Sequence, residues 1–264
     1  MAGYVHKALR NVGCLVRTGY WLTRERCCAE LPDENFANHL KVYRFAAQFG
    51  SDKNVLDVGC GTGYGTSFLA SSARSVVGID VSRQALRYAM SHYRGPNIRF
   101  VRMDAEHLEF ADRSFDFVIS TENFEHLRDQ RANLREMSRV LRDDGMLLLA
   151  TPNREMFLEV DNPYHTHELG YEELLKMVRE CFGECLIAEN SLEPPTLEGR
   201  RLREQRKAKG AQGIDLSSIP FLWDKRIDTT WVSNSHSFFC LCRLPVRKSR
   251  CDQETPAGFI ENRG

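Results

Sequence analysis

The segment that most constrains the fold is a glycine-rich turn between a short apolar run and a run with helical spacing. It reads DVGCGTGYG, from Asp57 to Gly65. Glycine adopts positive φ angles at little cost and lets a ligand approach the backbone with no Cβ in the way. The free N–H groups at the start of the following helix suit a carboxylate or a phosphate. The turn therefore predicts a strand–turn–helix unit that binds a ligand at its glycines.

Strand-like and helix-like patterns alternate around this turn. Apolar runs typical of buried strands occupy residues 54–59, 75–80, 97–104, 114–121, 146–151, 184–190 and 236–244. Helical spacing marks residues 34–49, 62–70, 82–93, 129–142 and 169–182. The turn signal Asp144-Gly145 comes just before the fifth run. Strands that alternate with helices predict a parallel sheet covered on both faces.

The spacing of the glycines separates two classes of ligand. Dinucleotide enzymes carry G-x-G-x-x-G/A in this turn. Counted from Gly59 the last position is Tyr64, and counted from Gly61 it is Thr66. A nicotinamide-dependent oxidoreductase is therefore disfavoured, although it stays the alternative enzyme class.

Three aspartates mark the ends of successive predicted strands. Asp57, Asp80 and Asp104 end the first, second and third strands. Capping and turn formation explain one such residue, but three of them beside a glycine turn favour a ligand site. Open α/β sheets bind ligands at the carboxyl ends of their strands.

These motifs together resemble the seven-strand family of S-adenosylmethionine-dependent methyltransferases. The resemblance continues through VVGIDVS, MDAEHL, SFDFVISTENFEHL and EMSRVLRDDGMLLLATPN, and covers residues 35–190 well and the last strand more weakly. It implies a three-layer, Rossmann-like α/β fold with a seven-stranded, mostly parallel sheet whose last strand is antiparallel. It also implies S-adenosylmethionine as the cofactor, with Asp80 on the ribose hydroxyls and Asp104 and Ala105 on the adenine. The residues expected to bind the cofactor are Tyr43, Asp57, Gly59, Gly61, Gly63, Asp80, Val81, Asp104, Ala105 and Thr121.

The helix before the first strand is similar to that of a bacterial subgroup of methyltransferase-domain proteins, some of them associated with glycan assembly. The subgroup carries H-x-x-R-Y-x-F-A, and His39, Tyr43, Phe45 and Ala46 match it. Val42 stands where the arginine is usual, so no role of that arginine is carried over. Tyr43 is either a cover over the cofactor or a core aromatic residue.

The candidates for catalysis lie after the fourth and fifth strands. Much of the acceleration of methyl transfer can come from positioning, and a hydroxyl acceptor also benefits from a base, most often histidine. Glu125-His126 is similar to a pair frequent in quinone-pathway methyltransferases, and His165 lies in a stretch similar to the subgroup's N-P-[FY]-H-x-x-E. We expect His126 as the base, with Glu125 and His165 beside the acceptor. The alternative is that His126 only holds its loop.

The composition of the chain limits which binding partners and which cellular compartment are expected. Lys+Arg and Asp+Glu both number 36, so the net charge is zero and nucleic acid is not expected. Nine cysteines, an odd number, argue against a disulfide framework. With no apolar run of membrane-spanning length and no signal peptide, we expect a cytoplasmic protein. The cluster of His165, His167 and Glu168 lies on one loop, which makes a poor zinc site, so no metal is expected.

The expected organisation has three parts. Residues 1–33 form an N-terminal extension, either a loosely docked segment or a membrane-surface helix. Residues 34–244 form the methyltransferase domain, in which 191–232 is a lid or insertion and the basic run at 200–209 is a solvated segment. Residues 245–264 form a flexible tail. The expected acceptor is a small molecule, glycan or lipid precursor methylated on oxygen or carbon, and the non-enzymatic alternative is a protein that binds S-adenosylmethionine without turnover.

Overall fold

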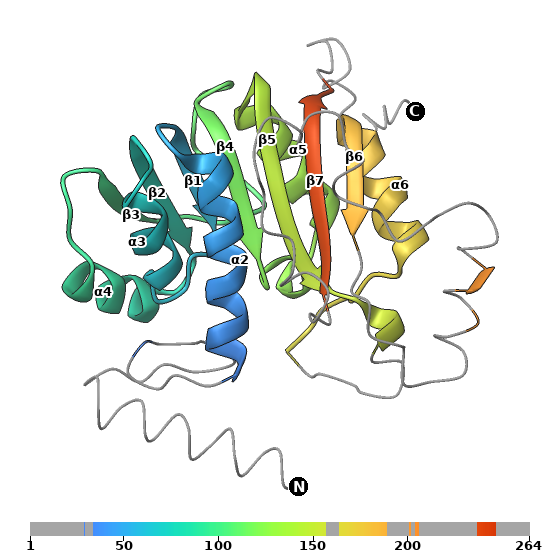
Figure 1. Ribbon diagram of the computed structural model, residues 1–264, viewed down its shortest axis with the longest axis horizontal. Helices are drawn as coiled ribbons and strands as arrows, with labels where there is room; N and C mark the ends of the chain where they lie inside the picture. The colour runs from blue at the N-terminus through green and yellow to red at the C-terminus, as the bar shows by residue number, and fades with distance from the viewer. Residues whose placement is uncertain are drawn as a thin grey trace, which may run out of the picture.

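The computed structural model shows a single seven-stranded sheet with helices on both faces (Figure 1). The structure describes residues 34–156, 164–188 and 237–246, together with positions 29, 201, 204 and 205. Almost all of the expected N-terminal extension, lid and tail lies outside these described residues, as does most of the basic run.

The order of the strands across the sheet is β3-β2-β1-β4-β5-β7-β6. The strands are β1 (Asn54–Val58), β2 (Ser75–Asp80), β3 (Ile98–Arg102), β4 (Phe115–Thr121), β5 (Leu141–Pro152), β6 (Phe182–Ala188) and β7 (Ser237–Pro245). The pairs from β3 to β5 are parallel, whereas β7 is antiparallel to both β5 and β6. The predicted sheet is confirmed, including its antiparallel last strand.

The helices follow the predicted alternation. They are α2 (Glu34–Gly50), α3 (Tyr64–Ala70), α4 (Arg83–His92), α5 (Gln130–Val140) and α6 (Tyr171–Cys181), with short 3-10 turns η1 (Phe124–His126) and η2 (Arg154–Met156). Side chains cap two of them: Ser82 accepts a hydrogen bond from the N–H of Ala85, and Asp129 accepts one from the N–H of Ala132. Such caps satisfy N–H groups that have no partner within the helix.

The boundary between α5 and β5 differs from the prediction. The helix ends at Val140, and Leu141 is already extended and paired with Phe115. The next pair is Phe117 with Met146, so β5 carries extra residues that its neighbour lacks. The glycine of the predicted turn, Gly145, lies in this irregular stretch, where it relieves crowding: an added Cβ would lie 2.9 Å from Leu141 Cδ2. The turn signal thus marks a bulge within a longer strand.

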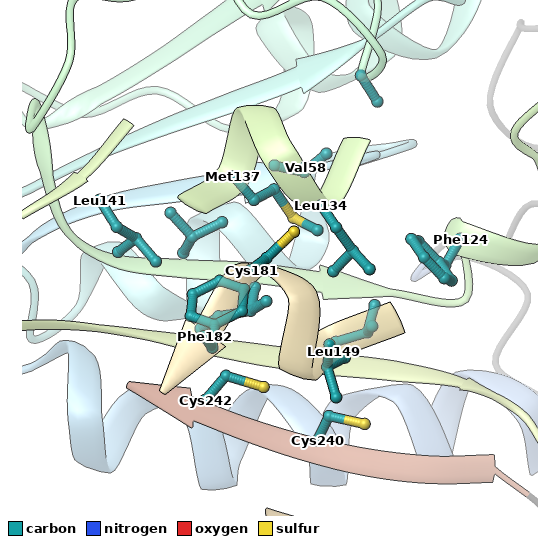
Figure 2. Packing of buried hydrophobic residues seen from close by; sticks show 14 of the residues in the cluster. Val58, Phe124, Leu134, Met137, Leu141, Leu149, Cys181, Phe182, Cys240 and Cys242 are labelled. Atoms are coloured by element: carbon teal, nitrogen blue, oxygen red, sulfur yellow. The ribbon is translucent and has the colours of Figure 1, made fainter. Parts of the chain in front are cut away.

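Two hydrophobic cores lie on opposite faces of the sheet, because successive side chains of a strand point to opposite sides. In β7, Phe238, Cys240 and Cys242 pack with α5 and α6, whereas Phe239 and Leu241 pack with α2. Figure 2 shows the α5–α6 core, where two sulfur atoms of β7 lie beneath helix side chains. This core places the ends of β4 and β5, from which the loops of the candidate site leave the sheet.

Candidate active site

Three glycines with positive φ shape the turn after β1. Their φ angles are 77° at Gly59, 54° at Gly61 and 83° at Gly63. A Cβ added to Gly59 would lie 2.3 Å from Cγ of Asn123, and one added to Gly63 would lie 2.7 Å from Cβ of Ala89. A Cβ on Gly61 would meet nothing within 4 Å among the described residues. Packing therefore requires two of the glycines, and Gly61 faces open space where a ligand can approach.

Two carboxylates lie at the ends of the neighbouring strands β2 and β3. Asp80 accepts hydrogen bonds from the N–H of Gly61 at 3.0 Å and from that of Ser82 at 2.7 Å. Asp104 accepts one from the N–H of Glu106 at 2.9 Å. The residues that follow these aspartates in the chain differ in burial: Val81 is 55% exposed and Ala105 is 6% exposed. The two predicted aspartates therefore lie at the same edge of the sheet as Gly61.

Asp57 and Tyr43 lie beneath the turn and not at its surface. Both are buried, and Asp57 accepts hydrogen bonds from Thr66 Oγ1 at 2.6 Å and from the Tyr43 hydroxyl at 3.1 Å. Burial raises the pKa of Asp57 to about 6, while these two hydrogen bonds oppose the rise and Asp80 adds to it. Tyr43 packs in the core cluster on the α2 face of the sheet.

Thr121, at the end of β4, carries a buried hydroxyl that lacks a partner. Its residue is 6% exposed, and Oγ1 makes no hydrogen bond within the described part of the chain. A buried polar group without a hydrogen bond costs stability, so an unsatisfied one at a strand end is typical of a binding site. With the open space at Gly61, this hydroxyl fits a bound cofactor with polar groups.

The acceptor-side candidates come together from two loops that are distant in sequence. Glu125 is 1% exposed, and its Oε1 lies 3.8 Å from Nε2 of His126. The rings of His126 and His165 have centroids 5.0 Å apart. One ligand atom from each of the three residues lies within 4.8 Å of the other two. We call Glu125, His126 and His165 the acceptor-side trio.

Hydrogen bonds lock the two loops of the trio together. The carbonyl of Glu125 accepts from the N–H groups of Thr166 at 2.7 Å and His167 at 3.3 Å. Gln130 Nε2 donates to the carbonyls of both Phe124 and His167. Because these bonds fix the backbone on both sides, the trio is held in place before any ligand binds.

The partners of each trio side chain set its chemistry. Nδ1 of His126 lies 2.9 Å from the carbonyl of Tyr164, and Nδ1 of His165 is hydrogen-bonded to Glu168. Burial and then nearby Glu122 raise the pKa of Glu125 well above its usual range, opposed by His165 and Thr151. His167 is instead half exposed and hydrogen-bonds Glu173 at 3.0 Å.

Comparison with known proteins decides the family. Residues 56–149 match the family described as methyltransferase domain. A probable S-adenosylmethionine-dependent methyltransferase of Mycobacterium tuberculosis is 35% identical over 200 residues, which cover 74% of this chain and 70% of that protein. The chain belongs to the S-adenosylmethionine-dependent methyltransferases. This membership decides against the nicotinamide-dependent alternative and makes S-adenosylmethionine the cofactor.

Solved structures agree on the fold of this methyltransferase. A methyltransferase in complex with a Haloferax volcanii methyltransferase activator has a TM-score of 0.57 at 17% identity, over 90% of this chain and 94% of that chain. A Bacillus halodurans methyltransferase has a TM-score of 0.52 at 20% identity, over 80% and 100% of the two chains. At sequence identities this low, the similarity shows a shared fold and nothing about function.

Several residues that were not among the predicted catalytic or cofactor-binding residues support the site. Asn123 fills the space against Gly59, and Glu122 has a positive φ of 47° while its side chain accepts a hydrogen bond from Ser237. Thr66 donates a hydrogen bond to the carboxylate of Asp57, and Glu168 is hydrogen-bonded to Nδ1 of His165. The sequence carried one usable signal: Glu168 was part of the matched N-P-[FY]-H-x-x-E stretch.

Among the described residues, no helix is both long and apolar enough to span a membrane.

Proposed function

We propose that this methyltransferase methylates an oxygen, or alternatively a carbon, of a small-molecule, glycan or lipid-precursor acceptor, with His126 as the base. The observation that carries the proposal is the trio itself. Its polar side chains follow β4 and β5, and Asn123, which precedes the trio, packs against Gly59 of the cofactor turn. An acceptor between the turn and the trio would have a histidine on its far side.

The turn and strand ends would hold the cofactor. Gly61 offers the open approach, Asp80 and Asp104 offer carboxylates for hydroxyl and amino donors, and Thr121 offers an unsatisfied hydroxyl. Bound S-adenosylmethionine supplies a methyl group whose bond to sulfur breaks as the bond to the acceptor forms, with the electron pair returning to sulfur. Fixed positioning of this kind can supply much of the acceleration of such a transfer.

His126 would receive the proton of an acceptor hydroxyl. Hydrogen bonding of Nδ1 to the Tyr164 carbonyl makes Nδ1 the protonated nitrogen of the neutral ring, so the lone pair is on Nε2. Proton transfer to Nε2 creates a cation 3.8 Å from Oε1 of Glu125. The positive charge on the ring in turn favours the ionised form of Glu125, so the two groups stabilise each other's charge once the proton has moved.

The acceptor class is supported from two sides. A phthiotriol/phenolphthiotriol dimycocerosates methyltransferase of Mycobacterium ulcerans is 37% identical over 123 residues, covering 45% of each chain, and its name describes a lipid acceptor. Zero net charge disfavours nucleic acid as the acceptor.

A cytoplasmic location is part of the proposal, because the five described cysteines are free thiols.

The test compares His126→Ala with a matched control, His167→Ala, on the neighbouring loop. Release of S-adenosylhomocysteine is measured with a phenolic small molecule, a glycan with free hydroxyls and a long-chain lipid alcohol. We expect His126→Ala to lower turnover by roughly 10²–10⁴-fold while affinity for S-adenosylmethionine is retained. His167→Ala should behave like the wild type, and equal turnover of the two variants would remove His126 as the base.

A further inference from the structure

The acceptor-side trio has the composition of a metal site as well as that of a base and its neighbours. Two imidazoles and one carboxylate converge, and their ligand atoms lie within 4.8 Å of one another. The set draws on both loops, in contrast to the cluster of His165, His167 and Glu168 that the sequence indicated. His167 is directed to Glu173 instead. Bringing ligands from two rigid loops removes the objection to a site built on one loop.

The distances are close to those that a bound ion requires. Zinc binds histidine nitrogen and carboxylate oxygen at about 2.0–2.2 Å, so two ligand atoms in a tetrahedral site lie about 3.3 Å apart. Nε2 of His126 and Oε1 of Glu125 are 3.8 Å apart. All three ligand atoms lie within 4.8 Å of one another, so binding requires side-chain rotations that bring them closer. The hydrogen bonds to the Glu125 carbonyl hold the backbone of both loops while the side chains rotate.

The outer partners of the two histidines also match those of metal ligands. Histidines that bind metals almost always donate their other ring N–H to a carbonyl or a carboxylate, which fixes ring orientation and tautomer. Nδ1 of His126 is engaged by the Tyr164 carbonyl, and Nδ1 of His165 by Glu168. Glu125 is 1% exposed and lies beside a second acid, Glu122, so a nearby cation would stabilise its ionised form.

We propose that Glu125, His126 and His165 form a binding site for a divalent transition-metal ion of the zinc class. Two histidines and one glutamate are a ligand set found at zinc sites that keep an open coordination position. Imidazole nitrogens favour zinc and its neighbours over magnesium, which prefers oxygen ligands. The site therefore discriminates between these ions by ligand type.

Metal binding has a consequence for turnover that rests on the proposed function. The ion and the acceptor proton compete for the lone pair on Nε2 of His126. A loaded protein therefore lacks the proposed base, and zinc acts as an inhibitor that a chelator reverses. Binding itself does not depend on the identity of the acceptor.

The test is a calorimetric titration of the chelator-treated full chain with zinc chloride, with neither cofactor nor acceptor present, and with magnesium chloride as the control ion. We expect His126→Ala, His165→Ala and Glu125→Gln each to lose one equivalent of bound zinc relative to the wild type. His167→Ala should lose none, and magnesium should give no such equivalent. Circular dichroism verifies that each variant is folded, and Glu125→Gln preserves shape at the buried position.

The outcomes separate the metal site from the proposed function. Equal zinc stoichiometry and affinity in the wild type and the three trio variants would overturn the metal site, as would an equal loss in His167→Ala. A parallel titration with S-adenosylmethionine and a turnover assay on the same samples report on the function. If the protein methylates an acceptor but binds no zinc equivalent at the trio, the metal site is overturned and the proposed function stands. A zinc equivalent lost in the trio variants supports the site, even if none of the acceptors tried is methylated.

Discussion

The hydroxyl of Tyr43 in α2 donates a hydrogen bond to the carboxylate of Asp57, 3.1 Å away at the end of β1. The Tyr43 ring also occupies the space beside Gly65, where an added Cβ would lie 2.0 Å from it. Through these two contacts the helix that precedes the sheet supports the glycine turn from below. The match to the subgroup's helix pattern thus has a structural reason in this chain.

The buried Asp57 makes stability depend on pH. Its pKa is raised from 3.8 to about 6 in the folded state. As pH falls through this window, the folded state takes up the proton before the unfolded state does, so the free energy of unfolding rises. Above pH 6 the ionised carboxylate costs roughly 3 kcal/mol, at about 1.4 kcal/mol per pKa unit.

Asp57→Asn should remove this pH dependence. Urea unfolding of the wild type and the variant at about pH 7.5 and about pH 5 measures it. The stability of the wild type relative to the variant should improve by about 1.4 kcal/mol at the lower pH, because pH 5 lies about one unit below the pKa of Asp57 in the folded state. A difference between the two proteins that is the same at both pH values would contradict the burial account.

Gly59 and Gly61 should respond differently to alanine. Gly61→Ala meets open space, so its cost is that of a positive φ, about 1–2 kcal/mol, while its methyl group occupies the cofactor's approach. Gly59→Ala adds a clash with Asn123 and should destabilise the fold more. Thermal melting and cofactor titration separate the two effects. Full cofactor affinity in a folded Gly61→Ala protein would show that the open space is not used.

Thr121→Val tests the unsatisfied hydroxyl. Replacing a buried, unpaired hydroxyl with a methyl group of similar shape removes a desolvation cost, so the cofactor-free protein should gain roughly 1 kcal/mol or more of stability. Affinity for S-adenosylmethionine should fall if the hydroxyl binds the cofactor. Thr151→Val is the matched control, because Thr151 Oγ1 already donates to Glu125 at 3.2 Å and its loss should destabilise the protein. Lower stability of Thr121→Val would mean that the hydroxyl is satisfied.

Asp80→Ala should weaken cofactor binding by roughly 1.5–3 kcal/mol, the value of a hydrogen bond to a charged group. Asp143→Ala, which removes an exposed partner of Arg113 far along the chain, is the control and should bind normally. Calorimetric affinities of both variants decide the point. Wild-type affinity in Asp80→Ala would remove the assignment of this carboxylate to the ribose hydroxyls.

The cofactor edge could be predicted from sequence because its features are local. Each glycine or aspartate sits at a strand end, and the strand pattern alone brings Gly61, Asp80 and Asp104 to one edge. The role of Tyr43 was left open, because a buried aromatic residue and a ligand cover share one residue type. In the structure Tyr43 is buried and donates a hydrogen bond to Asp57, a contact between residues 14 positions apart that the pattern did not indicate.

The geometry of the acceptor side could not be predicted in the same way. His126 and His165 come together through hydrogen bonds between loops about 40 residues apart, such as that from the Thr166 hydroxyl to the His126 carbonyl. The sequence analysis predicted His126, Glu125 and His165 beside the acceptor, but the only metal cluster it considered was His165, His167 and Glu168 on one loop. The two rings nevertheless have different partners: His165 Nδ1 is hydrogen-bonded to Glu168, and His167 Nε2 lies 3.0 Å from Glu173.

The cofactor site is tested by calorimetric titration of the purified chain with S-adenosylmethionine and S-adenosylhomocysteine, with NADH as the control. We expect one molecule of either sulfur compound to bind per chain and NADH to give no heat of binding. Binding of NADH, or no binding of either sulfur compound, would contradict the assignment of the glycine turn and its aspartates to the methyl-donor cofactor.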